Sequence, residues 1–282
     1  MKENKVSMEQ LKAVLERKKT KPAGKYAEMF FRPFTYRVVL FFVRNNINAN
    51  TATAIHILLG IIGLLLILAG TKACVIAGVI SLQLWFFTDL VDGEVARFRE
   101  EISVTGIYYD IMSHYIMFPF IFAVFGIYGY QSEQNIYVLY LTVISCIAIL
   151  LRKLVDDGQL TALTIQLNRD TENYYSIEHD GTKKAEKPIN DNSYLKSYSV
   201  KKLIKALISL FYMLNNFPAI MNLMCLVLIY KSIISDKYPL ILAVLCFYAV
   251  SLNIIWLWII FNVIRKKKVD QKYFSLKLKQ KN

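Results

Sequence analysis

Charged residues are almost absent from several long stretches of this 282-residue chain, although its formal net charge is +13 and 55% of its residues are hydrophobic. That combination excludes an ordinary soluble globular domain and is typical of a membrane protein with basic flanks. A helix needs roughly 20 mostly apolar residues to cross a hydrocarbon layer. Six stretches are long enough, near residues 51–70, 73–90, 106–126, 136–154, 203–230 and 238–264. We therefore predict an all-α integral membrane protein with six transmembrane helices.

Cysteine is also scarce, with four residues that all lie in apolar runs and have no paired spacing with histidines: Cys74, Cys146, Cys225 and Cys246. This pattern gives no indication of a disulfide framework or a zinc site, and it indicates small buried side chains. A cleavable secretory signal is not indicated either, because 50 residues with eleven Lys or Arg precede the first apolar run. No internal repeat is evident.

Positive charge is unevenly distributed between the two sides of the predicted bundle. Of the 34 Lys and Arg, 31 lie before the first span or in and close to the segments that follow the second, fourth and sixth spans, and the other three are Lys72, Lys231 and Lys237. Basic flanks tend to stay in the cytoplasm, so both termini are predicted to be cytoplasmic and the membrane to be the inner (cytoplasmic) one. The basic run at 265–268 would attract anionic membrane lipids by roughly 1 kcal/mol per residue. The charge therefore does not require a nucleic acid partner.

The polar regions divide the chain into three parts. Residues 1–48 comprise a cytoplasmic tail or short solvated helix, followed by an N-terminal interfacial amphipathic helix in which arginines alternate with apolar residues. Residues 49–268 form the membrane domain, with a polar cytoplasmic loop at about 156–202 that has no helical periodicity. Residues 269–282 form a basic tail.

Ionisable side chains are concentrated in TDLVDGEVARFREEISVTGIYYDIMSH, residues 88–114, at the inner edges of two apolar segments. An ionised Asp at the centre of a membrane helix is disfavoured by about 2.5–3.5 kcal/mol, so residues kept there usually face a polar cavity. The alternative is that they are simply the water-exposed ends of two spans.

Helical spacing favours the cavity. At 3.6 residues per turn, Gly106, Asp110 and His114 form one stripe, and Asp89 and Asp92 lie about 60° apart on the preceding helix. If the two helices pack as an antiparallel pair, three carboxylates and an imidazole converge. Hard carboxylate ligands favour divalent ions such as Mg²⁺ or Mn²⁺, and two such ions often hold phosphate oxygens.

Small residues and one arginine complete the pattern. Gly93, Ala96 and Gly106 would let a large ligand approach the backbone, and Arg97 offers a charged fork suited to phosphate. Arg152 and Lys153 are candidates for binding the phosphate of an acceptor or lipid, or they are ordinary positive-inside anchors. His56 and His179 are interpreted as a packing residue and a solvated loop residue.

These residues resemble a family motif. Asp89, Asp92, Gly93, Ala96, Arg97, Gly106 and Asp110 match the CDP-alcohol phosphotransferase pattern D-x2-D-G-x2-A-R-x8-G-x3-D-x3-D at every fixed position except the last. INANTAT, residues 47–53, is similar to the entry of the family into its first span, with Ala49 in place of proline. The resemblance covers about residues 25–265 and agrees with six spans.

The resemblance implies that a CDP-linked donor, either CDP-diacylglycerol or a CDP-polar alcohol, transfers its phospho-group to a hydroxyl of an alcohol or lipid and releases CMP. It implies that Asp89, Asp92 and Asp110 bind two Mg²⁺ or Mn²⁺ ions. It also implies a nucleotide held by Asp92, Gly93, Ala96, Arg97 and Gly106, a homodimer, and a place in phospholipid or lipid-linked glycan synthesis.

His114 occupies the position of the last motif aspartate, and three interpretations stay open. Imidazole can bind a metal ion and accept a proton near neutral pH, so His114, with Asp110, is a candidate catalytic residue as well as a ligand. It could instead be a packing residue in a variant whose acceptor needs less activation. The third interpretation is a catalytically altered, CDP-binding homologue. An intramembrane prenyltransferase, which also uses Asp-rich motifs, is a further alternative, as is a scaffold or transporter.

Overall fold

The computed structural model describes residues 6–17, 32–100, 104–176, 208–234 and 238–280, and the regular structure of these residues is entirely helical. Its labelled helices are α1 (Met8–Arg17), α3 (Arg32–Arg44), α4 (Ala49–Leu68), α5 (Lys72–Arg99), α6 (Val104–Glu133), α7 (Ile136–Ser176), α9 (Phe217–Ile233), α10 (Leu240–Arg265) and α11 (Lys268–Gln280). The chain divides into two compact units, Met1–Leu150 with Phe217–Ala249 and Leu151–Asn216 with Val250–Asn282.

Long apolar helices dominate the structure, which confirms the all-α membrane class. Five helices, α4, α5, α6, α7 and α10, are long and apolar enough to span a membrane, and the bent pair Ile208–Leu214 and Phe217–Ile233 gives a sixth if counted as one span. The predicted start of the fifth span, near residue 203, lies outside the described residues.

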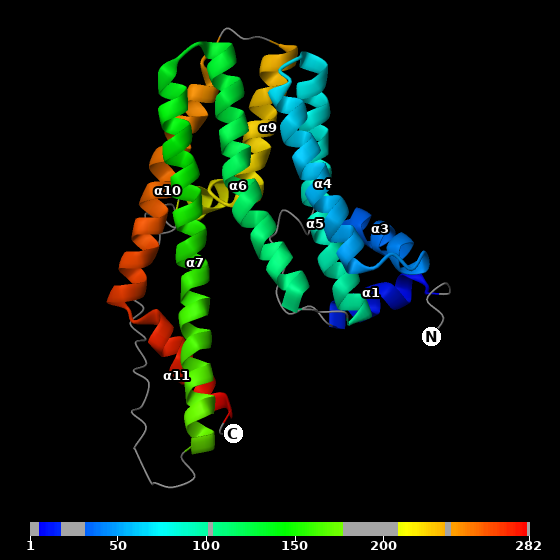
Figure 1. Cartoon of the computed structure of the whole chain (residues 1–282), viewed down its shortest axis with the longest axis vertical. Coiled ribbons are helices and arrows are strands. Elements are labelled where there is room, and N and C mark those ends of the chain that lie inside the picture. Colours follow the sequence, from blue (N-terminus) through cyan, green and yellow to red (C-terminus); the bar gives the residue numbers. More distant parts are fainter. Residues whose placement is uncertain (1–5, 18–31, 101–103, 177–207, 235–237, 281–282) are drawn as a thin grey trace, which may run out of the picture. The chain divides into compact units, whose positions relative to one another are not determined.

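Helices α4 and α5 lie side by side in the first unit (Figure 1). Asn48 and Thr71 cap their N-termini by accepting hydrogen bonds from the backbone N–H groups of Thr51 and Cys74. A Cβ built on Gly78 would lie 2.7 Å from the carbonyl oxygen of Gly63, so the two backbones touch where glycine alone fits. This close contact holds α5, which carries Asp89 and Asp92, against α4.

The N-terminal helices pack beside α5. Leu11 and Leu15 of α1 are buried in one cluster with Val39 and Val43 of α3 and Val91 of α5. The Arg44 guanidinium donates two hydrogen bonds to the Val6 carbonyl, at 3.1 and 2.9 Å. We expected a tail or a short solvated helix in this region. Instead, α1 packs on the apolar side of α5, the helix that carries Asp89 and Asp92.

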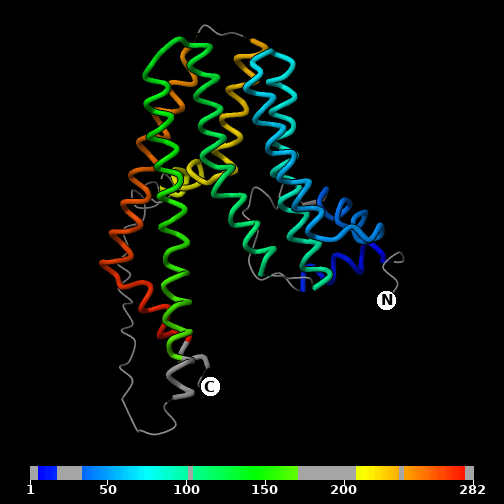
Figure 2. The backbone as a smooth tube through the Cα atoms, in the orientation of Figure 1, coloured from blue at the N-terminus to red at the C-terminus, as the bar shows by residue number. Residues whose placement is uncertain are grey.

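Helix α6 changes direction part-way along its path (Figure 2). It contains Pro119, which cannot donate a backbone hydrogen bond and commonly bends a membrane helix. The Pro119 carbonyl accepts a hydrogen bond from the Cys146 thiol of α7 at 3.3 Å. The bend separates the half of α6 that carries Asp110 and His114 from its C-terminal half.

A buried ion pair joins three helices at the C-terminal end of α6. Lys231 Nζ lies 2.9 Å from Glu133 Oε1, and the two side chains are 0% and 4% exposed. Glu133 also accepts hydrogen bonds from the backbone N–H groups of Ile241 and Leu242, at 3.0 and 3.2 Å. This carboxylate therefore caps α10 and neutralises a lysine of α9.

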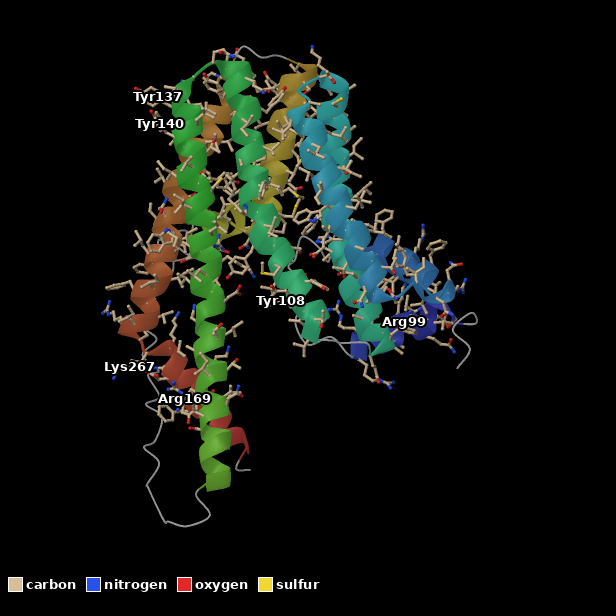
Figure 3. The ribbon with its side chains drawn as sticks, viewed as in Figure 1. Arg99, Tyr108, Tyr137, Tyr140, Arg169 and Lys267 are labelled. Atoms are coloured by element: carbon tan, nitrogen blue, oxygen red, sulfur yellow. The ribbon has the colours of Figure 1, made fainter. Side chains whose placement is uncertain are left out.

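Helix α7 is longer than the predicted fourth span. We expected a polar loop from about residue 156, but the helix continues to Ser176, and residues 177–207 lie outside the described part. In the second unit, Asp170 accepts a hydrogen bond from the Tyr273 hydroxyl of α11, which supports the polar extension. At the other end of α7, Tyr137 and Tyr140 are exposed, and Figure 3 shows them near its first turns, where an aromatic belt would meet headgroups.

Candidate active site

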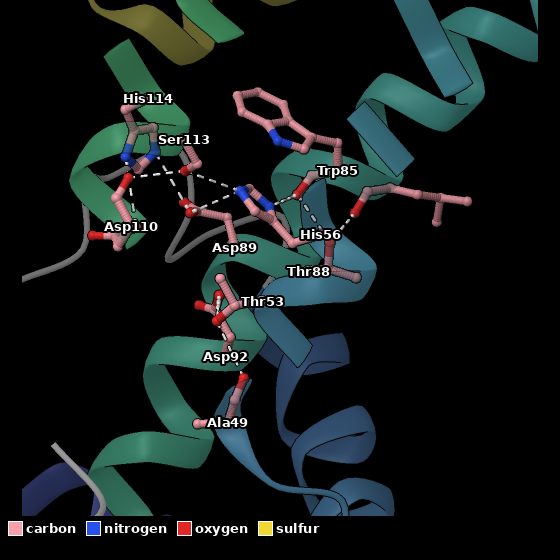
Figure 4. Close-up of polar contacts among 11 residues, drawn as sticks. Ala49, Thr53, His56, Trp85, Thr88, Asp89, Asp92, Asp110, Ser113 and His114 are labelled. Carbon is pink, nitrogen blue, oxygen red and sulfur yellow. Dashed lines mark hydrogen bonds and ion pairs between the residues drawn. The ribbon is translucent and has the colours of Figure 1, made fainter. Parts of the chain in front are cut away.

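Helix α5 contributes two carboxylates that face different neighbours. Asp89 and Asp92 are one turn apart, and Asp92 is 8% exposed. Asp92 Oδ2 accepts a hydrogen bond from the Thr53 hydroxyl of α4 at 2.9 Å (Figure 4). Asp89 points toward α6. The 60° separation of the two side chains around the helix explains why they contact different elements.

Helix α6 contributes Asp110 and His114, also one turn apart. The imidazole lies between two carboxylates, because His114 Nδ1 is 3.5 Å from Asp110 Oδ1 and His114 Nε2 is 3.5 Å from Asp89 Oδ1. The side chain of Asp110 is 53% exposed, and that of His114 is 20% exposed. The cluster therefore has a buried side against α5 and an open side for a ligand.

Asp89, Asp110 and His114 each offer a donor atom, and these atoms all lie within 4.8 Å of one another. Two carboxylate oxygens and an imidazole nitrogen suit a divalent ion, and without a cation the two carboxylates would repel each other. Asp92, which we predicted as a fourth ligand, is not part of this group, because its carboxylate is turned toward Thr53.

The glycine after Asp92 lies under the end of the Arg97 side chain. A Cβ on Gly93 would meet only the Arg97 guanidinium, at 3.5 Å from Nη1, which is an ordinary contact distance. Packing within the described residues therefore does not require glycine there, whereas close approach of a ligand to α5 would. Ala96 packs against the α1–α3–α5 cluster, and Gly106 lies one turn before Asp110.

Arg152 and Lys153 belong to the second unit. The Arg152 guanidinium donates hydrogen bonds to the Asn215 carbonyl and to Asn216 Oδ1. Lys153 Nζ lies 3.3 Å from Asp157 Oδ2. Both side chains are thus engaged inside their own unit, and their role toward phosphate stays a prediction.

Sequence reasoning missed His56 as a member of the site. This residue of α4 is 1% exposed and stacks on Trp85, as expected of a packing histidine. Its Nε2, however, lies 3.8 Å from Asp89 Oδ1 (Figure 4). The available signal was its spacing of three residues from Thr53, which puts both polar side chains on neighbouring positions of one helix face.

Comparison with protein families gives one match. The family model for CDP-alcohol phosphatidyltransferase matches residues 46–230, a range that contains α4, α5, α6 and all of the clustered side chains. Comparison with curated proteins finds no significant match.

Proposed function

The chain belongs to the CDP-alcohol phosphatidyltransferase family, and we propose that it transfers a phospho-alcohol or phosphatidyl group from a CDP-linked donor to a hydroxyl acceptor and releases CMP. The family is an enzyme class whose members transfer such groups from CDP donors. The observation that carries the proposal is the cluster formed by Asp89 of α5 with Asp110 and His114 of α6, inside the matched range.

Asp89, Asp110 and His114 would hold a divalent ion, Mg²⁺ or Mn²⁺, and Asp92 would complete a site for a second ion after turning away from Thr53. A bound ion supplies positive charge that neutralises the diphosphate and stabilises the departing CMP. The donor set fits this chemistry, since oxygen and imidazole ligands accept hard and borderline ions.

The residues around the cluster would bind the nucleotide. Arg97 would pair with a phosphate through its planar fork. Gly93, Ala96 and Gly106 would let the donor lie against the helix backbones, and Asp92 would lie beside the bound nucleotide. The proposal is supported by the position of the Arg97 guanidinium over Gly93, with Nη1 3.5 Å from where a Cβ would lie.

Once the bound donor has replaced it on the ion, His114 would act as the general base, because its nitrogen lone pair is then free to accept a proton. The acceptor oxygen attacks the phosphorus, its proton passes to an imidazole nitrogen, and the bond between that phosphorus and the CMP oxygen breaks as CMP leaves. The contacts of His114 with Asp89 and Asp110 would stabilise the imidazolium that forms. Asp110 would thereby orient the base as well as bind metal.

We further propose that both termini and the site face the cytoplasm and that one substrate is a membrane lipid. A site at the edge of the bilayer is accessible to a lipid from the side. The basic flanks, with Arg152 and Lys153, would contact anionic headgroups or the phosphate of the acceptor. A homodimer through membrane helices is part of the same proposal.

A catalytically altered homologue is the second candidate, and the histidine at the last motif position favours it. Such a protein would bind CDP compounds without releasing CMP. The family match supports both candidates over an intramembrane prenyltransferase.

The test uses the full chain in lipid vesicles with Mg²⁺ or Mn²⁺ and radiolabelled donors of both classes, CDP-diacylglycerol and CDP-polar alcohols, each with a panel of acceptors. We expect stoichiometric CMP release and transfer of label for one pair of donor and acceptor, and near-complete loss in Asp110→Asn, which removes a charge without changing the size of the side chain. Binding of every donor without CMP release would contradict the enzyme proposal and support the altered homologue.

A further inference from the structure

The hydroxyl of Thr53 on α4 has two acceptors within reach. Its Oγ1 lies 2.9 Å from Asp92 Oδ2 of α5 and 3.1 Å from the Ala49 carbonyl oxygen of its own helix (Figure 4). A hydroxyl carries a single proton, so it can donate fully to only one of these oxygens. An ionised carboxylate is the stronger acceptor, because a hydrogen bond to a charged group is about twice as strong as one between neutral groups.

This hydrogen bond accounts for the position of Asp92 in the site. In the described part of the chain, Asp89, Asp110 and His114 form the cluster with donor atoms within 4.8 Å of one another, and Asp92 is not among them. Asp92 follows Asp89 by one turn of α5, so a change of its χ1 to another staggered rotamer would redirect the carboxylate without moving the helix. One side-chain contact, rather than the path of the backbone, therefore keeps this carboxylate apart from the cluster.

The second acceptor makes the contact with Asp92 reversible. After release of Asp92, the Thr53 hydroxyl would donate to the Ala49 carbonyl, which is the bond to residue i−4 that threonine commonly forms inside a helix. Asp92 itself is buried, and a buried carboxylate that loses its donor is unfavourable unless a cation takes the place of that donor. The contact is thus one that a bound cation can replace and that forms again when the cation leaves.

Two divalent ions in one site repel each other and need anionic ligands between them. In two-metal sites for phosphoryl transfer the ions lie about 3.5–4 Å apart. Asp89 and Asp110 together contribute two negative charges, and His114 contributes none when its imidazole binds a metal ion. The diphosphate of a CDP-linked donor would supply further negative charge. A second ion is therefore stabilised most when the donor is bound.

We propose that Thr53 is a positioning residue that holds Asp92 away from the cluster, so that the chain by itself binds one divalent ion and takes up the second only together with the diphosphate of the donor. This inference rests on the proposed function, because it concerns the order in which the site for the transfer reaction is assembled. Thr53 contacts no reacting atom in this role and acts through Asp92.

The experiment records electron paramagnetic resonance of Mn²⁺ bound to the full chain in phosphatidylcholine vesicles, with and without CDP, which carries the diphosphate but no group to transfer. Two Mn²⁺ ions about 3.5–4 Å apart give a spin-coupled spectrum, whereas a single ion gives an uncoupled one. We expect one uncoupled ion per wild-type chain without CDP and a coupled pair with CDP. Vesicles without protein, at the same Mn²⁺ and CDP concentrations, give the background.

Variants at the two partners test the hydrogen bond itself. Thr53→Val removes the hydroxyl and keeps the shape of the side chain. A coupled pair should then form without CDP, at an Mn²⁺ concentration about 10- to 100-fold below that at which the wild type without CDP forms one, because the bond to the carboxylate no longer competes. Thr53→Ser keeps the hydroxyl and should behave as the wild type does, and Asp92→Asn should bind one ion with or without CDP.

The wild-type spectra are decisive even if a variant fails to fold. A coupled pair without CDP at the Mn²⁺ concentration that fills the first site, or no coupled pair with CDP, would overturn the proposal. A folded Thr53→Val protein whose second ion binds as weakly as in the wild type, or more weakly, would overturn it as well. These results would leave CMP release by the wild type unaffected, whereas no Mn²⁺ binding at all would also contradict the metal dependence in the proposed function.

Discussion

Substitution of Gly93 by alanine should change stability and activity in opposite directions. A Cβ at this position would lie 3.5 Å from Arg97 Nη1, which is ordinary van der Waals contact, so the folded chain can accommodate it. Alanine is more favourable than glycine inside a helix by about 0.8–1.0 kcal/mol. We therefore expect Gly93→Ala to raise the free energy of unfolding by up to about 1 kcal/mol.

The same methyl group would occupy the space that the donor needs beside α5. We expect CMP release by Gly93→Ala to fall at least tenfold, which corresponds to about 1.4 kcal/mol of lost transition-state stabilisation. Thermal unfolding by circular dichroism and CMP release are measured on the same preparation, so that loss of activity cannot be attributed to loss of folded protein.

Gly158 of α7 provides the matched control, because a Cβ there would have nothing within 4 Å. Gly158→Ala should gain similar stability and keep full CMP release. The reasoning would be refuted if Gly93→Ala unfolds at a lower temperature than the wild type, or if it releases CMP as fast as the wild type does.

Three further outcomes are expected. Glu133→Gln leaves the buried Lys231 without its carboxylate, so detergent-solubilised protein should lose about 3–5 kcal/mol of stability. Adding Lys231→Met should restore much of the unfolding temperature. An unchanged unfolding temperature in the single variant would contradict this expectation. His114→Ala should lower kcat for CMP release by about 10² or more, whereas His114→Asp keeps a measurable part; equal rates for Ala and wild type would exclude a catalytic imidazole. Arg97→Lys should raise KM for the CDP-linked donor more than it lowers kcat, since a point charge replaces the fork, and an unchanged KM would argue against phosphate binding by Arg97.

The membrane architecture and part of the site could be predicted from the sequence for simple physical reasons. Uncharged runs longer than a bilayer is thick can be recognised without knowing any tertiary contact. Positions 110 and 114 share a helix face at any packing angle, so the proximity of Asp110 and His114 follows from their spacing.

The other features of the site depend on tertiary contacts and could not be predicted from the sequence. The orientation of Asp92 depends on Thr53, and the location of His56 depends on α4 lying against α5; neither neighbour is encoded in the spacing on α5. The continuation of α7 past residue 156 was missed because Asp156, Asp157 and Gly158 interrupt the apolar run, although Leu160, Leu163 and Leu167 recur at helical spacing. The contact of this extension with Tyr273 comes from a distant part of the chain.

The central claim is that Asp89, Asp110 and His114 form a metal-dependent site for transfer from a CDP-linked donor. Its most direct test is CMP release from that donor as a function of Mn²⁺ concentration, compared between the wild type and Asp89→Asn. We predict that release requires the metal in the wild type, stops on chelation, and is at most marginal in Asp89→Asn even at saturating Mn²⁺. Metal-independent release, or equal release by Asp89→Asn, would contradict the claim.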